Sequence, residues 1–286
     1  MLSNLKRRYT TTSSLQFAGR KKELSWLSCL TDDYLDGKTG FKVASLYGMA
    51  GIGKTALLKQ YATSIMPAYM SDKVSMVYLD VGAKGQSPLS CLNSIFKQLD
   101  SNAPLYEYAL ARLYEDTGLV TKSDLDSGVY DDARFFKALA LASIAQPRST
   151  TPLSLFEVVL NTKAAPYLYR YENDYADVFA IIDKMADFEL QACLPCLLGM
   201  SVYNESKQGR KFVFVYDGYE DIQRGAYFEG GSFPVDWWLK EFVSAAEVGL
   251  HIISGRRAVD WSSDNDKWEG YITNHHIDLL SDSDVG

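Results

Sequence analysis

The stretch Gly48-Met-Ala-Gly-Ile-Gly-Lys-Thr55 places three glycines just before a lysine and a threonine. Its spacing, Gly-x4-Gly-Lys-Thr, is the pattern of a phosphate-binding loop. The glycines allow backbone turns that side chains would block, so that successive N–H groups can surround phosphate oxygens. We therefore predict that Lys54 reaches the β- and γ-phosphates of a nucleotide and that the Thr55 hydroxyl binds Mg²⁺.

The segments on either side of this loop have the character that such a site requires. Residues 41–47 are rich in side chains that favour a buried strand. Residues 55–66 have helical periodicity, and a helix beginning near Thr55 would add the positive end of its dipole to the phosphate site. This order of strand, loop and helix distinguishes the motif from a chance glycine-rich turn.

The rest of the chain alternates between strand and helix patterns, except in one long stretch. We expect strands at 74–81, 211–217, 248–254 and 277–280, and helices from Glu23 onward, at 88–99 and at 237–246. Alternation of this kind indicates a parallel sheet with crossover helices. Helical periodicity dominates residues 101–210. We therefore predict a three-layer α/β fold over residues 15–286, with 101–210 as a mainly helical insertion.

Three charged residues further along the chain complete the candidate site. A phosphate loop needs an acid that holds Mg²⁺ through its water shell, usually at the end of a neighbouring strand. Asp217 ends an apolar run and is predicted to have this role. Glu220 follows it and is interpreted either as the base that orients the attacking water or as a solvated acid. Arg256 comes just after another apolar strand, where an arginine can meet the γ-phosphate.

Together these segments resemble the STAND class of signal-transducing P-loop ATPases, which are relatives of NB-ARC domains in the AAA-like branch. Residues 17–24 (FAGRKKEL) are similar to the family's F-x-G-R-x-x-E-L entry segment. Residues 47–55 are close to its G-M-[GA]-G-[IV]-G-K-T form of the phosphate loop, called Walker A. Residues 212–221 (FVFVYDGYED) resemble its second acidic motif, called Walker B.

Two later segments extend the resemblance towards the end of the chain. Residues 237–261 resemble the family segment that carries a sensor arginine, here Arg256. Residues 277–285 (IDLLSDSDV) resemble the junction that leads into a helical lid. The lid, winged helix and sensor repeats of the family are not in this sequence, so we expect a nucleotide-binding core of a longer protein, with its effector and sensor partners elsewhere.

The resemblance implies a switch that holds ADP in one state and ATP with Mg²⁺ in a second, self-associating state. It also implies slow hydrolysis and a role in defence or stress signalling. Lys54, Asp217, Glu220 and Arg256 would serve the chemistry, and Mg²⁺ would be held by Thr55 and, through water, by Asp217. The residues that would hold the nucleotide are Phe17, Gly19, Arg20, Gly48, Met49, Ala50, Gly51, Ile52, Gly53, Lys54, Thr55 and Ala56.

The bulk composition fits a packed globular protein. Of the 286 residues, 47% are hydrophobic and 23% are charged. The net charge of −7 gives no argument for a nucleic-acid partner, and no apolar run approaches the roughly 18 residues of a membrane span. We expect a cytoplasmic location. The basic, Ser/Thr-rich N-terminus is interpreted as a flexible tail over residues 1–14, with a mitochondrial transit peptide as the alternative.

Other functions stay open at this point. One alternative is a mechanical AAA-like ATPase that acts on nucleic acid or protein and has the same motifs. Another is a scaffold that has the fold and binds nucleotide but does not hydrolyse it. Cys193-Leu-Pro-Cys196 has the spacing of a redox motif. It falls within a long apolar helical stretch, however, so we predict that these cysteines are buried and structural.

Overall fold

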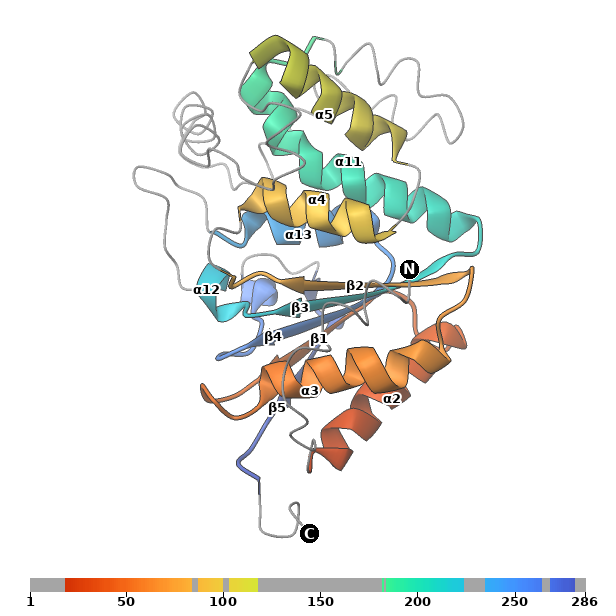
Figure 1. The fold of residues 1–286 in the computed structure, drawn as a ribbon, viewed down its shortest axis with the longest axis vertical. Helices are drawn as coiled ribbons and strands as arrows, with labels where there is room; N and C mark the ends of the chain where they lie inside the picture. Colours follow the sequence, from red (N-terminus) through yellow and green to blue (C-terminus); the bar gives the residue numbers. More distant parts are fainter. Residues whose placement is uncertain are drawn as a thin grey trace. The chain divides into compact units, whose positions relative to one another are not determined.

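The computed structural model describes residues 19–83, 87–99, 103–117, 182, 184–223, 235–263 and 268–280 (Figure 1). Phe17, the tail, most of the predicted insertion and residues 281–286 lie outside these ranges. The chain divides into two compact units. The first contains residues up to Gly82, 210–220 and those from Gly249 onward, and the second contains 83–209 and 221–248.

The first unit is built on a five-stranded sheet in the order β2-β3-β4-β1-β5, in which every pairing is parallel (Figure 1). Its strands are β1 (Lys42–Tyr47), β2 (Val74–Asp80), β3 (Lys211–Asp217), β4 (Leu250–Gly255) and β5 (Ile272–His276). The α/β class and the parallel sheet are therefore confirmed. Val74 pairs with Lys211, so β2 and β3 are neighbours in the sheet although they are far apart in the sequence.

Two helices of the first unit pack on one face of this sheet. They are α2 (Lys21–Leu35) and α3 (Lys54–Gln60), the latter continued by a π turn, η1 (Tyr61–Ile65), and a 3₁₀ turn, η2 (Met66–Ala68). The predicted helix at 55–66 corresponds to this continuous helical run. It tightens and ends around Pro67, because proline has no N–H to donate to the preceding turn.

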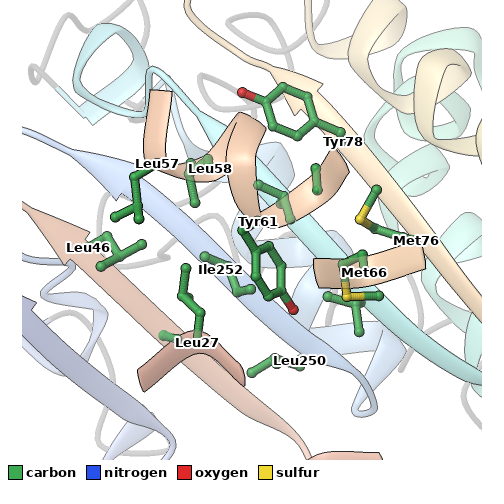
Figure 2. Packing of buried hydrophobic residues seen from close by; sticks show 14 of the residues in the cluster. Leu27, Leu46, Leu57, Leu58, Tyr61, Met66, Met76, Tyr78, Leu250 and Ile252 are labelled. Atoms are coloured by element: carbon green, nitrogen blue, oxygen red, sulfur yellow. The ribbon is translucent and has the colours of Figure 1, made fainter. Parts of the chain in front are cut away.

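The core between these helices and the sheet follows the two-residue period of the strands. Leu27 and Leu57 contribute from the helices, and Leu46 and Ile252 contribute from β1 and β4 (Figure 2). The opposite face is also buried, and there Phe214 stacks on His251 with ring centroids 4.7 Å apart. Burial of both faces explains why the strands of the sheet centre read as continuous apolar runs.

One predicted strand is wrong. We expected residues 277–280 to form the last strand, but the structure places it at β5, five residues earlier. Only Ile277 of the predicted segment is buried, and its N–H donates to Tyr47 O at 2.8 Å before the chain leaves the sheet. Strand β5 is an edge strand that pairs on one side only, so its sequence Ile-Thr-Asn-His-His need not be apolar.

The second unit is helical where it is described. Its main helices are α4 (Pro88–Leu99), α5 (Pro104–Thr117), α11 (Asp187–Lys207) and α13 (Trp237–Ala246). Helices α11 and α13 pack closely at Gly199, where an added Cβ would lie 2.7 Å from Phe242 O. The predicted helices at 88–99 and 237–246 are confirmed at both ends.

The cysteine pair lies inside α11 and is buried, as predicted. Burial raises the pKa of the Cys193 thiol well above its usual range, and the Cys196 thiol lies 3.4 Å from Glu241 Oε2 in the same unit. A redox pair needs an accessible thiolate of lowered pKa. The redox interpretation is therefore rejected in favour of the structural one.

Candidate functional site

The glycine-rich loop joins β1 to α3 at the carboxyl edge of the sheet. Strands β1 and β4 are neighbours there. The chain leaves β1 towards β2 and leaves β4 towards β5, so the two connections run in opposite directions along the sheet. Such a switch point is where open parallel sheets hold ligands. The loop thus occupies the position in this topology that is best suited to a binding site.

Two glycines are required by the geometry of the loop. At Gly48 a Cβ would lie 2.7 Å from Ile277 O, so the loop can pass the segment after β5 only without a side chain. Gly53 has φ of 96° at the position before α3, a conformation that L side chains rarely adopt. Between them, Met49, Ala50 and Gly51 are exposed. The loop therefore offers its backbone to solvent.

Lys54 is the first residue of α3 and bends back over the loop. Its Nζ donates hydrogen bonds to Gly48 O at 2.8 Å and to Met49 O at 3.0 Å. Burial is the largest influence on its ammonium group and lowers its pKa, while the carboxylates of Glu220 and Asp217 oppose that shift. The lysine is thus held, partly desolvated, beside two carboxylates.

Asp217 is the last residue of β3, as the sequence predicts, and its carboxylate is held by three donors. The Ser254 hydroxyl donates to Oδ1 at 2.7 Å, and the Gly218 N–H donates to the same oxygen at 3.1 Å. The Tyr78 hydroxyl donates to Oδ2 at 3.0 Å. The group is almost fully buried, with 4% of the residue exposed, so these bonds replace most of its hydration.

These three side chains meet because their strands present the same face. Residues 213 and 215 of β3 and residues 250 and 252 of β4 belong to the core below α2 and α3, as does Tyr78 of β2. Side chains alternate between faces along a strand, so Asp217 and Ser254 emerge on that face too. It is the face on which α3 begins.

Glu220 and Arg256 lie beside this centre and pair with each other. Glu220 begins the short helix α12 (Glu220–Gln223), and its Oε1 lies 3.4 Å from Arg256 Nε. The second oxygen, Oε2, is buried and has no hydrogen-bond partner among the described residues. Arg256 also acts on the pKa of Lys54, which it lowers. Glu220 and Arg256 therefore form an ion pair, and both charges influence the pKa of Lys54.

The entry segment reaches the loop through Arg20. This buried residue precedes α2 with φ of 60°, and its guanidinium donates to Ile52 O at 2.8 Å, to Asp278 O at 2.6 Å and to Glu23 Oε1 at 2.9 Å. One side chain thus ties the loop to the segment that follows β5. Its Nε is buried and makes no hydrogen bond in the described part of the chain.

The remaining predicted residues fall in three groups. Thr55 and Ala56 are exposed at the start of α3, next to the loop. Gly19 precedes Arg20 with φ of 77°. Phe17, which the resemblance places against adenine, lies outside the described residues.

Tyr78 and Ser254, whose hydroxyls donate to Asp217, are not predicted from the sequence. Both are polar side chains in mainly apolar strands, and this is a signal that points to them.

Neither the models of protein families nor the curated proteins contain a match to this chain. Among the residues that the structure describes, no helix is long and apolar enough to cross a membrane. The same residues contain no group of three or more side chains of the kinds that ligate metals.

Proposed function

We propose that this chain is a STAND-like P-loop protein that binds ATP or ADP with Mg²⁺ at the loop of residues 48–55. The proposal rests most on one observation. Lys54, at the junction of a glycine-rich loop and a helix, bends back over the loop and donates to Gly48 O at 2.8 Å and to Met49 O at 3.0 Å. A phosphate loop also needs an acidic partner at the same edge of the sheet, and Asp217 ends β3 at that edge.

In this proposal Lys54 exchanges its partners when a nucleotide binds. Its ammonium group leaves Gly48 O and Met49 O, which are neutral acceptors, for phosphate oxygens, which are charged and form stronger hydrogen bonds. The exposed backbone of residues 49–51 and the start of α3 supply further donors. Arg20 supports the loop from behind through Ile52 O.

The donor set fits a magnesium ion that keeps most of its water. Thr55 is exposed and offers a hydroxyl at the second position of α3. Asp217 is suited to accept from a metal-bound water rather than to ligate directly, because three donors already occupy most of its acceptor positions. When bound, the ion would neutralise phosphate charge.

Glu220 is the proposed base for hydrolysis. Its Oε2 is buried, and no donor in the described residues satisfies it, so a water molecule oriented by this oxygen would relieve an unfavourable state. The ion pair with Arg256 restrains Glu220 through its other oxygen. A γ-phosphate would compete for the arginine. We therefore propose that Arg256 distinguishes ATP from ADP. Slow hydrolysis is what the family resemblance implies.

The cellular role follows from the resemblance and not from the site. By that resemblance the nucleotide controls self-association in defence or stress signalling, and the effector and sensor partners belong to other segments or other chains. Differential affinity for the two conformations is what would let ATP and ADP act as signals.

The test is to denature the purified chain and identify the nucleotide that it releases, beside Lys54→Ala. Recovery of ADP or ATP from the wild type, and of none from the variant, would support the proposal. If both proteins release nothing and ATP with Mg²⁺ does not raise their melting temperature, the proposal that this chain binds nucleotide is wrong.

A further inference from the structure

Core packing alone does not explain why residue 78 carries a hydroxyl group. The residue is buried among apolar side chains of the core, where a phenylalanine ring would fill the same volume (Figure 2). A hydroxyl in such a place costs free energy unless it is hydrogen-bonded. Here it donates to Asp217 Oδ2 at 3.0 Å, across from β2 to β3. Its partner is the acid proposed to face Mg²⁺.

The two oxygens of Asp217 are not equivalent. Oδ1 accepts from both the Ser254 hydroxyl and the Gly218 N–H. Oδ2 accepts from Tyr78. A carboxylate oxygen accepts about two hydrogen bonds, so Oδ1 is fully used and Oδ2 has one position left. A further donor, such as a metal-bound water, can approach only the oxygen that Tyr78 holds.

We infer that Tyr78 is a positioning residue, which fixes Asp217 Oδ2 towards the water shell of the Mg²⁺ ion while Ser254 fixes Oδ1. The inference rests on the proposed function. It assigns the Tyr78 hydroxyl a role in the metal dependence of nucleotide binding and no direct contact with the nucleotide. The ring itself belongs to the core and has only a packing role.

The strand register supports this assignment. Asp80 is opposite Asp217 in the β2–β3 pairing, and Tyr78 is one step back on the same face. The Tyr78 side chain therefore contacts the Asp217 carboxylate from the core side and not from the solvent side. Such outer-shell partners orient a metal-binding group, and their removal commonly lowers metal affinity by about 10-fold to 100-fold.

The experiment measures binding of a fluorescent ATP analogue at increasing Mg²⁺ concentration to the wild type and to Tyr78→Phe. We expect the half-saturating Mg²⁺ concentration to rise about 10-fold in the variant, with binding in the presence of EDTA unchanged. The matched control is Tyr61→Phe. Tyr61 is buried in the same core, but its hydroxyl pairs with Thr31, so that variant should keep the wild-type Mg²⁺ dependence.

A double-mutant comparison separates positioning from general destabilisation. If Tyr78 acts through Asp217, then Tyr78→Phe will not raise the Mg²⁺ requirement further in an Asp217→Asn background. Ser254→Ala removes a donor to the other oxygen without changing a ring in the core, and it too should raise the requirement. This variant keeps the inference testable if Tyr78→Phe does not fold.

The outcomes distinguish this inference from the proposed function. If the wild type binds nucleotide with a Mg²⁺ dependence that Tyr78→Phe and Ser254→Ala leave unchanged, the positioning role is wrong and the nucleotide site stands. A further rise caused by Tyr78→Phe in the Asp217→Asn background would also overturn it. If the wild type binds no nucleotide, both the inference and the proposed function fail.

Discussion

Arg256 Nε lies 3.4 Å from Glu220 Oε1, and the two residues follow the neighbouring strands β4 and β3. Arg256 is 47% exposed at its side chain, whereas Glu220 is 18% exposed. The exposed partner can therefore turn towards a ligand while the carboxylate stays in place. This asymmetry underlies the first two predictions.

Glu220→Gln should lower the rate of ATP hydrolysis about 100-fold, because the amide cannot accept the proton of the attacking water. The variant keeps the size of the side chain, so ATP affinity should change by about twofold or less. Steady-state phosphate release and nucleotide titration measure the two quantities. The control is Asp221→Asn at the adjacent exposed acid; an equal loss of turnover there would remove the special role of Glu220.

Arg256→Ala should weaken ATP binding by about 10-fold to 150-fold and leave ADP binding nearly unchanged, since a charge-assisted contact to the γ-phosphate is worth about 1.5–3 kcal/mol. Competition titrations with the two nucleotides give the affinity ratio. Arg257→Ala is the neighbouring control, because Arg257 is also exposed. Equal losses for ATP and ADP in Arg256→Ala would argue against recognition of the γ-phosphate.

Nucleotide affinity should fall as the pH rises through the lowered pKa of Lys54. Bound phosphate favours the protonated lysine, so its pKa is higher in the complex than in the free protein. When the pH is above the pKa of Lys54 in the free protein, binding takes up a proton, and the affinity falls as the pH rises. When the pH is below that pKa, the lysine is already protonated and the affinity is at its maximum. Titrations from about pH 7 to about pH 10 on wild type and Lys54→Arg measure this effect. The arginine stays charged throughout, so a slope of the same size in Lys54→Arg would contradict the assignment.

Gly48→Ala should lower the free energy of unfolding by about 1–3 kcal/mol, because the new Cβ would collide with Ile277 O and force the backbone apart. Urea unfolding measures the change. Gly40→Ala is a matched control within the same unit, since a Cβ there meets nothing within 4 Å. If the two variants are equally stable, the close approach of the loop to the segment after β5 is not rigid.

The native protein should react with a thiol reagent at Cys29 alone. Cys29 is exposed, whereas the other three cysteines are buried. Mass spectrometry of the labelled chain identifies the site, and unfolding in guanidinium should make all four react. A disulfide between Cys193 and Cys196 in the native protein would return the redox interpretation to consideration.

The sequence predicts the first unit well where local chemistry determines the structure. The strand, loop and helix around residues 42–60 have their own signals: extended-favouring side chains, required glycines and helical periodicity. Strand β3 is predicted at both ends because burial on both faces makes it a continuous apolar run. Its final acid, Asp217, is identified for the same reason.

The remaining features depend on contacts between distant segments. Strand β5 is polar because only one of its edges pairs, so an apolar pattern led to the wrong segment. Tyr78 contacts Asp217 across 139 positions of sequence. That contact exists only because β2 and β3 become neighbours in the sheet, which no local pattern encodes. The pairing of Glu220 with Arg256 depends in the same way on the order of β3 and β4.

The central claim is that the loop of residues 48–55 binds nucleotide through Lys54 with the help of Mg²⁺. Isothermal titration of the nucleotide-free chain with ATP, with and without Mg²⁺, tests it most directly, beside Lys54→Ala. We predict saturable binding to the wild type, which Mg²⁺ strengthens and which the variant loses. Binding to both proteins with equal affinity, or to neither, would contradict it.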